Sequence, residues 1–233
     1  MPARYNAESL PTVENLNAEA AARGLVSGGG APLRFAAPPD DGLNYEVRIR
    51  DRGLVATRPG NTHDLLNAQA WLDFPRAKAA LNALHCEQIA MQAGSVRSPV
   101  RDALTLFDES GLIVACDQDE LVGLLRGFNW KTLFWERRDE VKARMHFAVF
   151  GHALTEKLLS PYKGITAHAL ILACPSAMPR EVLDMQAAAA VAALRTTRDL
   201  APLPVLGIPG WTPHNEAHDY YDDTAHFRPG RRV

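Results

Sequence analysis

The apolar run Ala167–Ala173 constrains the fold more than any other segment of the chain. Its seven residues are an ordinary strand length, and a continuous apolar run is typical of a strand that is covered on both faces. We therefore expect a buried central strand here. The alanine-rich segment Pro179–Arg195 follows, and its length and composition predict a helix.

Two hairpins are predicted upstream of this strand. Tyr45–Arg50 alternates in polarity and is joined to Leu54–Arg58 by the turn residues Asp51-Arg52-Gly53. Leu104–Phe107 and Leu112–Cys116 are predicted to pair around Asp108-Glu109-Ser110-Gly111, which has ordinary turn chemistry.

Helical patterns occupy most of the remaining chain. The predicted helices are Glu14–Arg23, His63–Phe74, Pro75–Met91, a helix capped by Asp117 with Glu120 three residues later, and one long helix from Trp130 to Leu159. This order lacks the regular strand–helix alternation of a Rossmann fold. It predicts an α+β fold: a mostly antiparallel sheet, built from two hairpins plus a central strand, packed against several helices that include one long helix.

We expect a single domain with two accessory segments. Residues 1–44 are predicted to be an N-terminal lead-in with one short helix, and residues 45–200 the α+β core. Residues 201–233 contain several prolines and are predicted to be an extended C-terminal segment packed on that core.

Charge and cysteine content exclude several classes of protein. The formal net charge is −2 and no basic stripe is visible, so we do not expect a nucleic-acid partner. The chain has an odd number of cysteines, Cys86, Cys116 and Cys174, and they are widely spaced, which argues against a disulfide framework and a structural zinc site.

No leader-like segment and no run of about 18 apolar residues is present, so we expect a cytoplasmic protein without membrane contact. The sequence leaves the oligomeric state undetermined.

The densest group of polar side chains lies in residues 61–85. His63 and Asn67 are four residues apart and share one helix face, while Lys78, Asn82 and His85 form a stripe on the next helix. If the two stripes face each other across the bend at Phe74-Pro75, they form a site with hydrogen-bonding and proton-transfer capacity. The same residues also have structural interpretations, since Asn61 can cap the helix with Asp64 in its first turn, and Lys78 can reach to solvent.

A second candidate is the pair His152 and Glu156, four residues apart on the predicted long helix. Both fall on or beside its apolar stripe, so we predict that the pair is largely buried and closes on the region of His63. A buried carboxylate requires a partner, which can be His152, an arginine or a divalent metal ion. We favour a His152–Glu156 ion pair without a metal.

Two weaker candidates complete the search. Arg101 and Asp102 precede a predicted strand, where an arginine can hold a carboxylate or phosphate of a substrate. Near the C-terminus His214, His218 and His226 occur among aspartates, which suits either a metal-binding lid or a solvated segment.

Several segments, taken together, resemble a known family. They are YEVRI, VATRPGNTHDLLNAQAWLDFPRAKAALNALH, VRDALTLFDESG, FGHALTEKLLSPYKGIT and PLPVLGIPGW, and they occur in one order. This combination resembles the bacterial family catalogued as domain of unknown function 3025. The resemblance implies a shared fold unit over nearly the whole chain and no particular reaction. Gly60-Asn61-Thr62 and Leu66 depart from the aromatic residues that the resemblance leads us to expect, which can alter a pocket wall without removing the polar groups.

Two functions of different classes follow from these residues. The first is an enzyme acting on a small polar or anionic substrate: His63 or His85 serves as acid or base, Lys78 or Arg101 holds an anionic group, and the asparagines orient it. The second is a non-catalytic ligand-binding or regulatory module that uses the same pocket. A metal-dependent hydrolase or nuclease is a lesser alternative, because neither strand of the predicted first hairpin carries the histidine that H-N-H nucleases place there.

Overall fold

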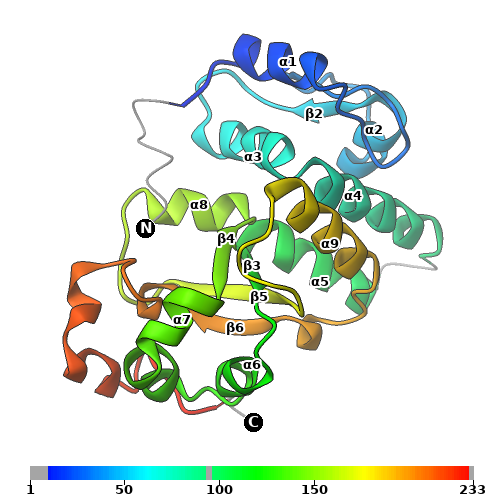
Figure 1. Ribbon diagram of the computed structural model, residues 1–233. Coiled ribbons are helices and arrows are strands. Elements are labelled where there is room, and N and C mark those ends of the chain that lie inside the picture. Colours follow the sequence, from blue (N-terminus) through cyan, green and yellow to red (C-terminus); the bar gives the residue numbers. More distant parts are fainter. Residues whose placement is uncertain (1–9, 93–95, 231–233) are drawn as a thin grey trace.

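The computed structural model describes residues 10–92 and 96–230, and it contains a four-stranded sheet and a two-stranded sheet among helices (Figure 1). The larger sheet has the order β4-β3-β5-β6. Its strands are β3 (Gly111–Ala115), β4 (His146–Val149), β5 (Thr166–Leu172) and β6 (Ala201–Pro204). Because β3 runs parallel to β5 but antiparallel to β4, the sheet is mixed. The α+β class is therefore confirmed. Two of the three strand pairings in this sheet are antiparallel, but the two predicted hairpins are not formed.

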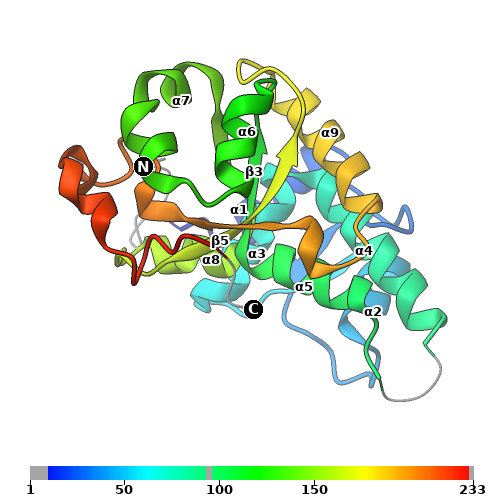
Figure 2. The same ribbon diagram turned by 90° about the horizontal axis from the view of Figure 1, so that it is seen from below.

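The central strand β3 is buried along its whole length. Leu112 and Val114 pack on one face with α6 (Asp119–Arg126), α7 (Arg138–Arg144) and residues near the C-terminus. Ile113 and Ala115 pack on the other face with α5 (Pro99–Ser110) and α9 (Arg180–Ala192). Figure 2 shows α6 and α9 near the strands from below. Successive side chains of β3 thus pack into two different apolar layers, and because both faces of the sheet are covered, β3 and β5 have apolar runs.

The predicted first hairpin is wrong in its first strand. Tyr45–Arg50 lies in helix α2 (Tyr45–Arg52), which begins after Asn44, whose side chain accepts a hydrogen bond from the Glu46 amide. The helix ends at Gly53, which has a φ of 64°. These two helix signals, an N-cap and a left-handed C-cap, outweigh a six-residue alternation. The predicted second strand exists as β2 (Leu54–Ala56), but its parallel partner is β1 (Arg34–Ala36).

The predicted second hairpin is wrong in the same way. Leu104–Phe107 belongs to α5, which starts with a Ser98 cap and Pro99. Asp108, Glu109 and Ser110 form its last turn and Gly111 already belongs to β3, so this segment is not a hairpin turn. The predicted strand Leu112–Cys116 corresponds to β3, with β4 as its antiparallel neighbour.

The predicted long helix from Trp130 to Leu159 is also wrong. It is divided into η2 (Thr132–Glu136), α7, the strand β4 and α8 (His152–Leu158). Pairing of β4 with β3 covers an edge that would otherwise leave main-chain groups unpaired, and this tertiary gain overrides the helical period.

The other predicted helices and the central strand agree with the structure, but one predicted helix cap does not. The helices are α1 (Val13–Ala22), α3 (Thr62–Asp73), α4 (Pro75–Ala90) and α9, and the apolar run Ala167–Ala173 corresponds to β5. Helix α6 follows Gln118 without a side-chain cap, so the predicted capping box at Asp117 is not formed. Four short 3-10 turns lie around and beyond β6: η3 (Thr197–Asp199), η4 (Val205–Gly207), η5 (Pro213–Glu216) and η6 (His218–Asp222).

A third apolar cluster joins α1, β1 and β2 to the inner face of α3. It includes Leu16, Phe35 and Trp71, each at most 2% exposed. The helical layer that carries His63 therefore has its own core, separate from the two cores of the larger sheet. Within the described residues, no helix combines the length and the apolar character needed to cross a bilayer.

Candidate functional site

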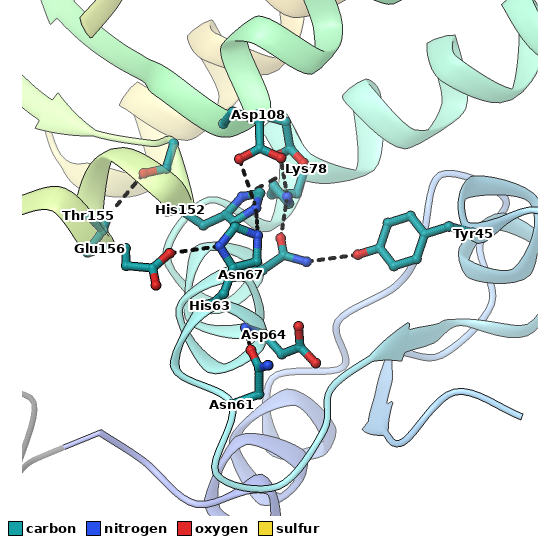
Figure 3. Close-up of polar contacts among 12 residues, drawn as sticks. Tyr45, Asn61, His63, Asp64, Asn67, Lys78, Asp108, His152, Thr155 and Glu156 are labelled. Atoms are coloured by element: carbon teal, nitrogen blue, oxygen red, sulfur yellow. Dashed lines mark hydrogen bonds and ion pairs between the residues drawn. The ribbon is translucent and has the colours of Figure 1, made fainter. Parts of the chain in front are cut away.

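Three helices bring chemically active side chains to one place between the helical layer and the sheet. His63 lies in the first turn of α3, His152 is the first residue of α8, and Asp108 and Glu109 lie in the last turn of α5. Figure 3 shows His63 and His152 facing each other, with Glu156 and Asp108 on either side. These residues are distant in sequence, so the site depends on the tertiary packing of α3 against α8.

Gly111 and Gly151 allow the end of α5 and the start of α8 to approach closely. A Cβ atom on Gly151 would lie 2.4 Å from the Gly111 nitrogen and 2.5 Å from the Glu109 carbonyl oxygen, too close for any side chain. The amides of Phe150 and Gly151 donate to the carbonyl of Gly111, at 3.0 and 2.9 Å. The glycine before His152 therefore fixes this histidine beside Asp108 and Glu109.

The two imidazoles are in direct contact. His63 Nε2 and His152 Nε2 are 3.1 Å apart, and the ring planes meet at 74°. The other nitrogen of His63, Nδ1, is 2.8 Å from Glu156 Oε2. A carboxylate on one ring nitrogen fixes the orientation and tautomer of the imidazole.

Glu156 thus has a protein partner, but not the predicted one. The structure pairs its carboxylate with His63, and its side chain is 43% exposed, so the predicted burial of the pair is confirmed for His152 and wrong for Glu156. The proximity of His152 to His63 agrees with the prediction. A His152–Glu156 ion pair, as favoured from the sequence, is wrong, because the nearest carboxylates to His152 come from α5.

The carboxylates of α5 surround His152. Glu109 Oε2 is 3.5 Å from His152 Nε2, and Asp108 Oδ2 is 3.9 Å from His152 Nδ1. Burial lowers the pKa of His152 to about 4, although Asp108 acts in the opposite direction. Burial, followed by the neighbouring charge of Asp108, raises the pKa of Glu109. At neutral pH the site therefore has an uncharged His152 beside a carboxylate.

One group of side chains among the described residues has the geometry to hold a metal ion. The ligating atoms of His63, Glu109 and His152 all lie within 4.8 Å of one another. Sequence reasoning found both histidines but missed Glu109, because Asp-Glu-Ser-Gly matches a turn. The signal that could have found it was the Ser98-Pro99 helix start, which places Asp108 and Glu109 at the end of a helix.

A buried polar network lies beneath the histidines. The Lys78 ammonium, on α4, donates to Asn67 Oδ1 at 2.9 Å and to Asp108, and Asn67 in turn donates to the Tyr45 hydroxyl at 2.8 Å. Burial raises the pKa of Asp108, but Lys78 and then His152 outweigh it, and the net result is a lowered pKa. Lys78 and Asn67 were predicted to converge, and they do. Their polar atoms are engaged inside the protein, so neither is positioned to contact a substrate.

The comparisons with known proteins give a family and no activity. The family described as "Protein of unknown function (DUF3025)" matches residues 33–231. The chain belongs to this family. No match was found among curated proteins or among solved structures.

Asn82 and His85 lie at the inner end of the polar network that includes Lys78. The Asn82 amide donates to the Glu46 carboxylate at 2.8 Å and accepts from the Gly28 amide at 3.2 Å. His85 is buried, and burial lowers its pKa to about 4. Burial also raises the pKa of Glu46 to about 7, with the charge of Asp108 as the next cause. Asn82 and His85 are therefore buried groups rather than a site wall, and Glu46 beside them is half-buried.

Asp64, Arg101 and Asp102 lie outside the contact between the histidines. The Asp64 carboxylate accepts hydrogen bonds from the main-chain amide and guanidinium of Arg58, and this arginine lowers its pKa. Arg101 and Asp102 begin α5 instead of a strand; Arg101 contacts Gln92, and Asp102 pairs with Arg97 at 3.2 Å. At 1.5 Å per helical residue, Arg101 is about 12 Å along the axis from Glu109.

Proposed function

We propose that this chain is a hydrolase of small polar substrates, and that it activates a water molecule where His63, Glu109 and His152 converge. The observation that carries the proposal is the 3.1 Å contact between two imidazole nitrogens beside a carboxylate, at a place that is open on one side. The side chains of His63 and Glu156 are 41% and 43% exposed, so solvent and a substrate can reach this side.

The chemistry follows from which groups hold protons. Glu156 accepts the Nδ1 proton of His63, which leaves Nε2 of the neutral ring as a base and electron-pair donor. Nitrogen bases and a carboxylate around one point are the groups that remove a proton from water and stabilise the charge that develops. His152 is buried on the sheet side and forms a rigid wall beside the place where water would be activated.

The substrate class follows from the groups that border the opening. Half-exposed Glu109 and Glu156 are acidic, and Lys157 lies near enough to Glu109 to oppose the rise in its pKa that burial causes. Lys78, which the sequence suggested as an anion-binding group, already neutralises Asp108. These surroundings favour a substrate with polar hydrogen-bonding groups and little net negative charge.

The test is a panel of chromogenic esters, amides and phosphate esters offered to the purified full chain. Hydrolysis of one class should fall at least about 100-fold in His63→Ala and in Glu109→Gln, because each removes a group at the reacting centre. His214→Ala, in an exposed residue of η5, should keep the wild-type rate. The hydrolase proposal is refuted if no class of substrate is hydrolysed. If a small molecule then raises the melting temperature of the wild type but not that of His63→Ala, the chain is a non-catalytic binding module.

A further inference from the structure

We infer that the gap between His63 and His152 is a binding site for one divalent transition-metal ion, with Zn²⁺ the best-matched ion. Its ligands are Nε2 of both histidines and the carboxylate of Glu109. The catalytic meaning of this site rests on the proposed function, since the ion would be the agent that activates the water. The binding itself is a separate property and can be measured without a substrate.

The first argument comes from the proton positions. His63 Nδ1 faces Glu156 Oε2, and a carboxylate can only accept, so the ring carries its proton on Nδ1. His152 Nδ1 makes no hydrogen bond within the described residues, but the Asp108 carboxylate, with Oδ2 at 3.9 Å, faces this nitrogen and favours a proton there. Both neutral rings then direct the lone pair of Nε2 into the same 3.1 Å gap. Two facing lone pairs repel unless a cation lies between them.

The second argument is distance. Two nitrogen ligands at 2.0–2.1 Å from a tetrahedral Zn²⁺ ion lie about 3.3 Å apart. The observed separation of the two Nε2 atoms is 3.1 Å, and Glu109 Oε2 is 3.5 Å from one of them. Helices α3, α5 and α8 therefore hold the three ligands close to the arrangement that an ion requires.

The third argument is the set of groups behind the ligands. Metal-binding histidines usually direct their second nitrogen at a carboxylate or a carbonyl, which orients the ring and raises its basicity. Here Glu156 accepts from His63 Nδ1 at 2.8 Å, and the Asp108 carboxylate faces His152 Nδ1 at 3.9 Å, beyond hydrogen-bond distance. Asp108 is itself held by buried Lys78, so the outer carboxylate on the sheet side has a fixed position.

The ligand set also indicates the kind of ion and the kind of site. Two imidazoles with one carboxylate suit Zn²⁺, Fe²⁺ or Mn²⁺, whereas Ca²⁺ and Mg²⁺ prefer oxygen ligands alone. Three protein ligands leave a coordination position for water, which distinguishes a catalytic site from a closed structural one. The exposed sides of His63 and Glu109 direct that position toward solvent.

The experiment is a calorimetric titration of chelator-treated full chain with Zn²⁺, together with Co²⁺ absorption spectra. We expect one ion per chain and a tetrahedral Co²⁺ spectrum. His63→Ala and Glu109→Gln should weaken binding at least about 100-fold, and Glu156→Gln about 10- to 100-fold, as expected for an outer-shell carboxylate. Circular dichroism checks that each variant is folded.

His214→Ala is the matched control, because it removes an exposed histidine from the histidine-containing segment near the C-terminus. It should bind as tightly as the wild type. The inference is overturned if wild-type protein takes up well under one equivalent of Zn²⁺, Fe²⁺ or Mn²⁺, or if His63→Ala binds as the wild type does. A proton shared by the two imidazoles would then fill the gap.

The two proposals fail in different ways. A stoichiometric, His63-dependent ion in a chain that hydrolyses nothing would refute the hydrolase and leave the metal site standing. A chain that takes up no ion in the titration, but whose hydrolysis still depends on His63, would refute the metal site and leave the hydrolase standing.

Discussion

The polar cluster has an inner half and an outer half, which differ in how their groups are paired. In the inner half, Lys78 is 2% exposed and its ammonium is shared between Asn67 and Asp108. In the outer half, His63 and Glu109 are partly open to solvent, and the Nε2 atoms of His63 and His152 are 3.1 Å apart. Buried polar groups are normally paired, so we expect the inner half to contribute to folding stability. We expect the outer half to bind a ligand, and substitutions in the two halves should separate these two roles.

The largest effect is expected at Lys78. Lys78→Met removes the cation that neutralises Asp108 and leaves a buried carboxylate unpaired, which should cost about 3–5 kcal/mol in the free energy of unfolding. Urea denaturation measures this loss. Lys157→Met, on the exposed side of α8, is the control and should change stability by less than about 0.5 kcal/mol. A loss below 1 kcal/mol at Lys78 would contradict the structural role of the inner half.

Gly151→Ala should have the next largest effect. The added methyl group would meet the Gly111 nitrogen and the Glu109 carbonyl, so α8 must move away from the end of α5. We expect a loss of about 2–3 kcal/mol, the usual cost of overpacking a rigid contact. Gly123→Ala, where nothing lies within 4 Å of the added atom, is the matched control and should be neutral or slightly stabilising. Thermal unfolding of the two variants gives the comparison, and equal melting temperatures would show that the close approach is unimportant.

Glu46 provides a test by pH. Its pKa in the folded protein is about 7, above the ordinary value of 4.5 for a glutamate, so the folded state binds the proton more tightly than the unfolded chain does. The contribution of Glu46 to stability is therefore complete below about pH 4.5 and is lost as the pH rises through 7. Asp108, Lys78 and Arg101 also face this carboxyl group.

Glu46→Gln removes this titration while keeping an acceptor for Asn82. The variant should gain about 2 kcal/mol relative to wild type between pH 5 and pH 8, measured by urea denaturation at both values. Glu14→Gln, at an exposed residue of α1, is the control and should show no such gain. A pH-independent difference at position 46 would mean that Glu46 titrates normally in the folded protein.

The smallest effect on stability is expected at His63. His63→Ala removes a half-exposed ring whose partner Glu156 is also open to water, so the loss should stay below about 1 kcal/mol. The same substitution should abolish the proposed activity. Denaturation and hydrolysis assays on one preparation check both statements. A stability loss comparable to that of Lys78→Met would remove the distinction between the two halves.

The parts of the fold that could be predicted are those with unambiguous local signals. Helices α3 and α4 carry Asn61 and Pro75 at their starts, and β5 has an apolar run that fits a covered strand. Tyr45–Arg50 and Leu104–Phe107 were misread because short apolar alternation fits a strand as well as a helix. In both segments the cap residues Asn44 and Ser98 carried the correct information.

The site was predictable in part for the same reason. His63, His152, Asn67 and Lys78 stood out because polar residues on an apolar helix face require partners, and the structure does bring them together. Glu109 was missed because its helix was taken for a hairpin. The pairing of Glu156 with His63, across 93 residues of sequence, depends on how α3 packs on α8, and no local pattern contains that information.

The junction between α5 and β3 has a consequence for motion. Glu109 lies two residues before the central strand, and His152 follows a glycine whose amide is bonded to the first residue of that strand. Both should share the slow amide exchange of a sheet centre. His63 instead belongs to the layer whose core is formed by Leu16, Phe35 and Trp71. The two imidazoles therefore come from parts of the fold with different cores, and a displacement of α3 relative to α8 would separate them and break the hydrogen bond between His63 and Glu156.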